Sequence, residues 1–416
     1  MTKKSDAPEI RFKGFSDAWE QRKLGEIGSV SMCRRIFKEQ TSETGDIPFY
    51  KIGTFGADPD AFISRELFEE YKSKYPYPQK GDILISASGS IGRTVEFAGN
   101  NEYFQDSNIV WLNHDERLSN PFLKCFYSVV KWAGIEGSTI KRLYNDNILN
   151  TVICMPSVPE QKRIGLFFEN LDNLITLHQR KFEKLTNVKK SMLEKMFPQN
   201  GSSYPEIRFK GFTDPWEQRK FGEVFMSLQN NTLSRAELND EFGAAQNIHY
   251  GDVLIKYDEI LDVSKEPLSY IEKQSIADKF KTSYLQNGDV IIADTAEDET
   301  VGKCTEIEGL TDQKVISGLH TMPVRPNRKF ASGFLGFYLN SAAYHDQLKP
   351  LMQGIKVTSI SKGAMQDTVV KFPLDLKEQE QIGIYFGGLD HLITLHQREL
   401  EKLHNIKKSM LEKMFV

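Results

Sequence analysis

Apolar residues recur at alternating spacings of four and three in two long stretches of the chain. This is the spacing of a heptad seam, and it predicts two long helices over 157–198 and 375–416. Each helix of this length would span roughly 55 Å. The seam positions are Ile164, Phe168, Leu171, Ile175, His178, Leu185 and Met192 in the first stretch, and Ile382, Phe386, Leu389, Ile393, His396, Leu403 and Met410 in the second.

Both predicted helices carry a start signal. Ser157 and Glu160 have the spacing of a capping box, and Asp375 and Glu378 repeat that spacing in the second copy. Pro198 is expected to end the first helix, because proline interrupts helical hydrogen bonding. Local signals therefore support the boundaries that the heptad pattern indicates.

Two helices of equal length in one chain are expected to pair, and an antiparallel pair would relate the two halves by a pseudo-two-fold axis. His178 lies near the middle of the first helix, so it is expected to lie close to His396 and to fix the register. The alternative is that both histidines are solvated edges of the seam. The apolar face is wider than one seam, so either the flanking blocks or helices of other chains must cover it. We favour partner helices.

Two pairs of internal repeats organise the rest of the chain. We call residues 8–27 and 205–224 the leading repeats, because "PEIRFKGFSDAWEQRKLGEI" and "PEIRFKGFTDPWEQRKFGEV" differ at few positions. The helix repeats, which end in "KKSMLEKMF" in both copies, follow from Leu174 and Leu392. The sequence therefore predicts a first globular domain over 1–156, the central helix over 157–198, a linker over 199–204, a second globular domain over 205–374 and the C-terminal helix over 375–416.

The two globular blocks are related more distantly. "KGDILISASGSIG" from Lys80 is similar to "NGDVIIADTAEDETVG" from Asn287, and "GSTIKRLYNDNILNTVICMP" is similar to "GIKVTSISKGAMQDTVVKFP". Each pair predicts a common scaffold of short strands with different polar loops. The expected fold class is α/β (α+β), with two globular domains joined by two long antiparallel coiled-coil helices in a pseudo-two-fold internal repeat. Divergent loops on one scaffold suggest two readers of different targets, and duplication followed by drift is the alternative.

Composition narrows the function classes only a little. The formal net charge of the 416 residues is −4, so any basic surface must be local. The four cysteines form no CxxC pair, which argues against a zinc site and favours reduced thiols in the cytoplasm. The chain also has no apolar run of about 18 residues and no apolar segment at its start, so neither a membrane span nor a signal peptide is expected.

Catalytic motifs are missing from the sequence. It contains no phosphate-binding GxxxxGK[ST] loop, no HExxH, no GxSxG, and no adenine pocket or glycine loop of an S-adenosylmethionine enzyme. "SGSIGRT" from Ser88 lacks the lysine and spacing of a phosphate loop and is interpreted as a loop tip. The sequence thus favours a binding protein without metal or cofactor.

The order of variable block, helix repeat, variable block, helix repeat resembles the specificity subunit of type I restriction-modification systems. The resemblance covers essentially the whole chain. It implies a non-catalytic protein whose two target recognition domains each read one half of a split DNA sequence. It also implies docking of two methyltransferase subunits and then restriction subunits, with S-adenosylmethionine, ATP and magnesium bound by those partners.

Base reading needs polar side chains on loops that reach a groove. In the first block, the candidate DNA-binding residues are Ser88, Ser90, Arg93, Gln105, Ser107, Asn108, Lys141, Arg142, Tyr144 and Asn145. In the second block they are Thr295, Lys303, Lys314, Ser317, His320, Lys356, Thr358, Ser359 and Lys362. Asp294, Glu297 and Asp298 are left out because they repel phosphate, although carboxylates accept from cytosine amino groups.

Two other function classes stay open. A coiled-coil scaffold with two protein-binding end domains would fit the near-neutral charge better than DNA binding does. An enzyme with a concealed nuclease or methyltransferase activity is disfavoured by the missing motifs. A salt series separates the scaffold from the DNA reader, because phosphate contacts give a steep salt dependence.

Overall fold

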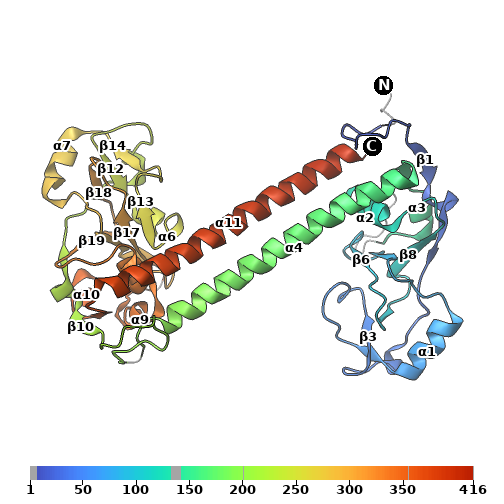
Figure 1. Ribbon diagram of the computed structural model, residues 1–416, viewed down its shortest axis with the longest axis horizontal. Helices are drawn as coiled ribbons and strands as arrows, with labels where there is room; N and C mark the ends of the chain where they lie inside the picture. Colours follow the sequence, from blue (N-terminus) through green and yellow to red (C-terminus); the bar gives the residue numbers. More distant parts are fainter. Residues whose placement is uncertain (1–6, 133–141, 200, 355, 416) are drawn as a thin grey trace. The chain divides into compact units, whose positions relative to one another are not determined.

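The computed structural model describes residues 7–132, 142–199, 201–354 and 356–415. The chain divides into two compact units, of which the first comprises Met1–Gln179 and Arg398–Val416 and the second Arg180–Gln397. Helices α4 (Val158–Lys195) and α11 (Leu376–Met414) each contribute to both units (Figure 1). The two long helices predicted from the heptads are therefore present.

The first unit is built on a four-stranded sheet of order β2-β8-β5-β6 and a three-stranded sheet of order β4-β3-β7. Its strands are β1 (Glu20–Lys23), β2 (Gly28–Ser31), β3 (Ile47–Tyr50), β4 (Phe62–Ile63), β5 (Ile83–Ser86), β6 (Thr94–Glu96), β7 (Tyr103–Phe104), β8 (Ile109–His114) and β9 (Val152–Met155). Its further helices are α1 (Arg65–Lys74), α2 (Asn120–Val129) and α3 (Asn145–Leu149).

Alternation along β5 divides the core of the first unit into two layers. Ile83 and Ile85 pack with α2 and the long helices, whereas Leu84 packs on the other face with the smaller sheet. Successive side chains of a strand point to opposite faces, so a fully buried strand indicates a sheet covered on both sides. The predicted strand after Lys80 is confirmed in this role.

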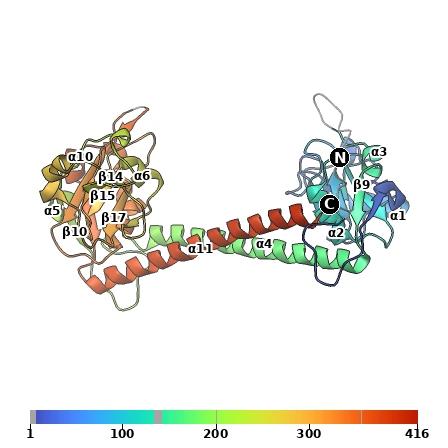
Figure 2. The same cartoon turned by 90° about the horizontal axis from the view of Figure 1, so that it is seen from above.

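The second unit repeats this plan with one more strand. Its main sheet has the order β11-β19-β15-β17-β13, and its smaller sheet has the order β14-β12-β18. Its strands are β10 (Glu217–Lys220), β11 (Phe225–Ser227), β12 (Ala245–Ile248), β13 (Ile260–Asp262), β14 (Ser269–Ile271), β15 (Val290–Ala293), β16 (Thr295–Ala296), β17 (Cys304–Glu308), β18 (Val315–Ser317), β19 (Thr321–Pro326), β20 (Thr358–Ser359) and β21 (Val369–Phe372). Its further helices are α5 (Phe221–Val224), α6 (Tyr250–Ile255), α7 (Gln274–Ala277), α8 (Phe334–Asn340), α9 (Ala342–His345) and α10 (Lys362–Gln366). Figure 2 shows β15 and β17 inside this unit, with α6 beside them.

The extra strand β13 depends on a glycine in α8. A Cβ atom on Gly336 would collide with the backbone oxygen of Glu259, which directly precedes β13. The structurally equivalent residue of α2 is Lys124, because Ser119 N donates to Gln161 Oε1 as Ala331 N donates to Gln379 Oε1. The first unit therefore lacks this fifth strand.

The leading repeats owe their similarity to a shared docking role. In each copy the sequence EQRK forms a strand, and β1 pairs with β9 as β10 pairs with β21. Arg11 makes a bidentate ion pair with Glu160 at 2.7 and 2.8 Å, and Arg208 makes the same pair with Glu378. Each leading repeat therefore holds the first turn of a long helix.

A backbone bond ties each leading repeat to the other long helix as well. Ile10 N donates to Lys413 O and Ile207 N donates to Lys195 O, both at about 3.0 Å. Lys195 and Lys413 are equivalent residues of the helix repeats. Each unit thus receives the start of one long helix and the end of the other in the same way.

The capping boxes predicted at the helix starts are wrong for both glutamates. The Glu160 carboxylate accepts hydrogen bonds from Arg11 instead. The Glu378 carboxylate accepts from Arg208 and, at 3.2 Å, from Trp216 Nε1. A buried carboxylate gains more from a bidentate guanidinium than from one backbone N–H group. Asp375 does cap α11, since its carboxylate accepts from the backbone of the residue two positions later.

The long helices run antiparallel inside each unit. In the first unit, Phe168 contacts Phe415, and four residues later Asp172 pairs with Lys407 at 2.5 Å. In the second unit, Lys189 pairs with Asp390 at 2.6 Å, and Phe197 stacks on Phe386. In both units, residue numbers that rise along α4 meet residue numbers that fall along α11.

The predicted proximity of His178 and His396 stays a prediction. His178 belongs to the first unit and His396 to the second. Both side chains are half-buried on the seam of their helices, where the heptad pattern expects them.

Glu306 gives the second unit a pH-dependent stability. Burial raises its pKa to about 7 from an ordinary 4.5, even though its carboxylate accepts from Gly333 N and Gly336 N. Between these two values the folded chain binds more protons than the unfolded chain, so stability falls as pH rises. We expect Glu306→Gln to remove on the order of 3 kcal/mol of this dependence between pH 4.5 and 7, measured by chemical denaturation.

Glu308→Gln is the matched control for this variant, because Glu308 lies two residues away on the same strand. It is expected to reduce the slope only slightly, because burial is the main cause of the raised Glu306 pKa and the charge of Glu308 is a smaller one. An unchanged slope in Glu306→Gln would contradict the assignment.

Candidate nucleic-acid interface

Three loop segments that are far apart in the sequence meet at one end of the main sheet in the first unit. Ala87, directly after β5, receives a backbone bond from Leu143 and donates one to Asn108. Ser88 forms a β-bridge with Arg142. Asn108 Oδ1 accepts from Ser88 Oγ at 2.7 Å and from Arg142 Nη2 at 3.1 Å. The sequence placed candidate residues on all three segments, and the structure brings them into one cluster.

The second unit assembles the same cluster from equivalent segments. Asp294, directly after β15, receives a backbone bond from Ile360 and donates one to His320. Thr295 pairs with Ser359 in the β16–β20 ladder. These bonds make Asp294 the equivalent of Ala87, His320 that of Asn108, Thr295 that of Ser88 and Ser359 that of Arg142.

Backbone strain marks the same loop in both units. Ser107 has a φ of 52° and His320 a φ of 54°. Within the described ranges they are the only non-glycine residues in the left-handed region. Ser107 lies between β7 and β8, and His320 lies between β18 and β19. Strained backbone of this kind clusters at binding sites, where surrounding contacts hold it in place.

The polar groups of the two clusters differ although the backbone is shared. The first cluster holds the guanidinium of Arg142 and the amide of Asn108. The second holds a carboxylate, because Asp294 Oδ1 accepts from Thr295 Oγ1 at 2.8 Å and lies 3.4 Å from His320 Nδ1. His320 also packs edge-on against Tyr250. One cluster is therefore rich in donors, whereas the other contains an acceptor with a negative charge.

The other candidates of the first unit lie around this cluster in different environments. Ser90, Arg93, Tyr144 and Asn145 are exposed, and Arg93 Nη2 donates to Gly56 O at 3.0 Å. Gln105 is half-buried, and its Oε1 accepts from Ile52 N at 2.8 Å.

Lys141 lies outside the described residues, so the structure gives no placement for this candidate.

The remaining candidates of the second unit divide between surface and interior. Lys314, Lys356 and Lys362 are exposed. Thr358 is half-buried, and Lys303 Nζ donates to Leu254 O at 2.9 Å.

Ser317 differs from these candidates because it is fully buried and bonded to Thr321 Oγ1. Its hydroxyl supports the β18–β19 loop from beneath and does not reach the surface.

The seam of the long helices is buried near their starts and half-buried further along. Ile164, Phe168 and Leu171 are buried in the first unit, and Ile382, Phe386 and Leu389 are buried in the second. The other seam candidates, which are half-buried, are Ile175, His178, Leu185, Met192, Ile393, His396, Leu403 and Met410.

Outside the seam, the two helices present the same exposed residues. Leu174 and Leu177 on α4 correspond to Leu392 and Leu395 on α11, and all four are exposed. Each helix also carries a shallow groove lined by the same residue types. The lining includes Arg180, Glu183, Lys184, Asn187, Ser191 and Met192 on α4, and Arg398, Glu401, Lys402, Asn405, Ser409 and Met410 on α11.

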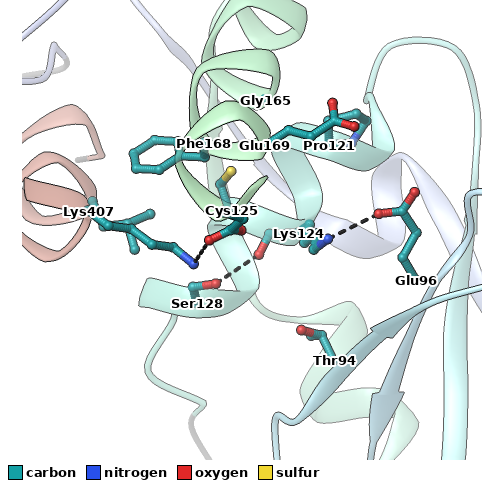
Figure 3. Close-up of a pocket in the computed structure, with 12 residues that line it drawn as sticks. Thr94, Glu96, Pro121, Lys124, Cys125, Ser128, Gly165, Phe168, Glu169 and Lys407 are labelled. Atoms are coloured by element: carbon teal, nitrogen blue, oxygen red, sulfur yellow. Dashed lines mark hydrogen bonds and ion pairs between the residues drawn. The ribbon is translucent and has the colours of Figure 1, made fainter. Parts of the chain in front are cut away.

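A cavity of about 240 Å³ lies between α2, α4, α11 and β6 in the first unit (Figure 3). Four of its charged groups form two ion pairs, since Lys407 binds Asp172 and Lys124 binds Glu96. Burial raises the pKa of the Cys125 thiol to about 12, so the thiol is not an activated nucleophile. The cavity thus has no arrangement suited to catalysis.

The described residues contain neither a metal-binding cluster nor a helix that could span a membrane. No group of three or more His, Cys, Asp or Glu side chains is placed to hold a metal ion. No helix there combines the length and apolar character needed to cross a bilayer.

Sequence reasoning set Asp294 aside, yet the structure places it at the centre of the second cluster. The available signal was its position directly after an apolar strand that repeats β5. The similar segments from Lys80 and Asn287 already place Asp294 opposite Ala87. The sequence could not show that this position meets the two other loop segments, because those contacts are backbone bonds to residues far along the chain.

Comparison with known proteins agrees with this geometry. The family model for the type I restriction modification DNA specificity domain matches residues 16–187 and again 213–405. A putative type I restriction enzyme specificity subunit of Haemophilus influenzae is 61% identical over 157 residues, which cover 37% of this chain and 41% of that protein. The MjaVIII specificity subunit of Methanocaldococcus jannaschii is 24% identical, covering 80% of this chain and 74% of its own.

Among solved structures, the S subunit of a type I restriction-modification system from M. genitalium has a similar fold. The TM-score is 0.55 with 15% identity, and the match covers 99% of both chains. Both halves of the repeat match the family model, and together they make up most of the sequence. The chain therefore belongs to the type I restriction-modification DNA specificity family.

Proposed function

We propose that this chain is the DNA-specificity subunit of a type I restriction-modification complex, in which each unit reads one half of a bipartite site. One observation carries the proposal. Equivalent segments build a polar cluster at the same place in both units, but the side chains of the two clusters differ in hydrogen-bonding character. A shared backbone with different polar groups is what two readers of different sequences require.

Joining two readers in one chain strengthens binding. Once one unit is bound, the other is held near its own half-site at a high effective concentration, so modest affinities combine. The net charge of −4 means that phosphate contacts must come from local cations and from partner subunits. Arg93, Lys356 and Lys362 are exposed near the clusters and are proposed to make such contacts.

The repeated helix faces support two copies of the same partner. Identical exposed residues on α4 and α11 offer two equal surfaces, and the proposed partners are two methyltransferase subunits. Restriction subunits would join this assembly. In this proposal the specificity subunit is non-catalytic and acts in the cytoplasm, while its partners bind S-adenosylmethionine, ATP and magnesium.

Exchange of one block tests the modular reading of DNA. Lys23 faces Val152 in the β1–β9 ladder, so residues 24–151 can be replaced by those of another family member without touching the Arg11–Glu160 ion pair. We expect the exchange to change one half of the methylated motif completely and to leave the other half unchanged. The measurement is a map of methylated adenines after co-expression with the methyltransferase.

The reciprocal exchange is the matched control. Lys220 faces Val369, so residues 221–368 form the equivalent block of the second unit. Its replacement should change the other half of the motif. A change in both halves, or in neither, would refute the assignment of one unit to one half-site. Duplex binding without salt dependence would instead favour the protein scaffold.

A further inference from the structure

The cluster of the first unit presents mainly hydrogen-bond donors, because the carbonyl oxygen of its amide side chain is already used. A side-chain carbonyl oxygen has two lone pairs. Those of Asn108 Oδ1 are occupied by Ser88 Oγ and Arg142 Nη2. The groups that remain for a ligand are the Asn108 amide N–H groups and the other donors of the guanidinium.

Neighbouring residues follow the same rule. Gln105 Oε1 accepts from Ile52 N, which occupies one of its two lone pairs and turns this oxygen toward the backbone. Asp106 is the carboxylate of this loop. Asp106 is half-buried, and its charge adds to the effect of burial, which is the main cause of the raised pKa of the Cys33 thiol. The surface around Arg142 is therefore dominated by donors.

The second unit presents a hydrogen-bond acceptor at the equivalent position. Asp294 stands where the first unit has Ala87, and a quarter of its side chain is exposed. Among the described residues, its carboxylate is contacted through Oδ1 only, by Thr295 Oγ1 and by His320 Nδ1. His320, whose backbone is in the left-handed region, has its ring beside this carboxylate. The second oxygen is left to accept from a ligand.

The bases of a G·C pair offer partners in the major groove for both a donor-rich cluster and an acceptor. Guanine offers two acceptors, O6 and N7, and binds arginine in a bidentate manner. Cytosine offers an N4 amino donor, which carboxylates accept. Adenine also has an amino group, but its N7 acceptor lies beside it and would repel a carboxylate.

We propose that each unit reads a G·C base pair in its own half-site, the first unit through the guanine and the second through the cytosine. Arg142, positioned by Asn108, binds the guanine in one half-site, and Asp294, positioned by Thr295 and His320, accepts from the cytosine amino group in the other. The inference rests on the proposed function, because it presupposes that each unit reads one half-site.

Base analogues test the proposal on the unaltered complex of this chain with its methyltransferase. In 7-deazaguanine a carbon replaces N7, and in N4-methylcytosine a methyl group replaces the amino hydrogen that faces the major groove. Each G·C pair of both half-sites is substituted in turn. We expect 7-deazaguanine to weaken binding about tenfold or more in the first half-site only, and N4-methylcytosine to do so in the second only.

Two variants connect these effects to the named residues. Arg142→Gln should abolish the sensitivity to 7-deazaguanine, and Asp294→Asn should abolish that to N4-methylcytosine. Each variant is the control for the other half-site. Arg117→Gln and Asp298→Asn are matched controls, because both side chains are exposed and their partners, Asp115 and Glu26 for Arg117 and Thr300 for Asp298, lie outside the two clusters.

The outcomes separate the inference from the proposed function. Equal sensitivity of both half-sites to one analogue, or insensitivity of both, would overturn the inference while a bipartite motif still stood. An Asp298→Asn effect as large as that of Asp294→Asn would show a general charge effect and would also overturn it. A complex that methylates no bipartite motif would refute the proposed function itself. Because the analogue series uses the unaltered protein, it decides the question even if a variant fails to fold.

Discussion

Replacing Glu378 with alanine is expected to lower the free energy of unfolding of the second unit by about 3–5 kcal/mol. The carboxylate is almost fully buried, with 2% of its side chain exposed, and it binds Arg208 through both oxygens. It also accepts from Trp216 Nε1. Alanine would leave a partly buried guanidinium and an indole N–H without partners, and unpaired buried charges are costly.

Chemical denaturation measures this loss of stability. Hydrogen exchange of the backbone amides in the first turns of α11 shows whether the loss arises at the start of this helix. The matched control is Asp367→Ala, which breaks the exposed ion pair with Lys220. Exposed pairs contribute about 0–1 kcal/mol. If Glu378→Ala were no more destabilising than Asp367→Ala, the docking role of the leading repeat would be wrong.

The same ion pair in the first unit lacks one of these bonds. Trp19 corresponds to Trp216, but its Nε1 atom is buried without a partner among the described residues. Glu160→Ala is therefore expected to cost less than Glu378→Ala, because only the pair with Arg11 is lost.

Changing Leu177 and Leu395 to glutamate together is expected to abolish capture of both methyltransferase subunits. These leucines are 47% and 44% exposed at equivalent positions of α4 and α11. Burying a leucine contributes about 1.5–3 kcal/mol, and burying a carboxylate in its place adds a desolvation cost. Each substitution should therefore weaken one site at least about tenfold.

Native mass spectrometry of the assembled complex measures the number of bound methyltransferase subunits. Two are expected for the original chain, one for either single variant and none for the double variant. Thr186→Glu with His404→Glu is the control, because these equivalent exposed positions have diverged. Two partners retained by the double leucine variant, or lost by the control, would contradict the proposed docking face.

The repeats made the larger architecture predictable from sequence. Heptad spacing located both long helices, and similar polar loops after similar strands pointed to equivalent sites. The capping boxes failed because the partners of Glu160 and Glu378 lie 149 and 170 residues away, beyond the reach of a local motif. Tertiary ion pairs of this kind override local capping signals.

Individual roles within the site were less accessible to sequence reasoning. Gln105 and Ser317 have residue types suited to base contacts, yet tertiary neighbours use their acceptor or bury them. Asp294 has a type that phosphate repels, yet its place beside Thr295 and His320 gives it an acceptor role. Residue type identifies what a side chain is able to bond, whereas the fold decides which of its atoms stay free.

The first unit includes the C-terminal segment Arg398–Val416, and this has a consequence for synthesis on the ribosome. Trp19 and Phe122 pack against Phe415, and Phe168 also contacts it. At about 5–20 residues per second, translation from Gln179 to Phe415 takes roughly 10–50 s. The unit that is made first is therefore completed last, and its aromatic cluster must stay without its final member while the second unit emerges.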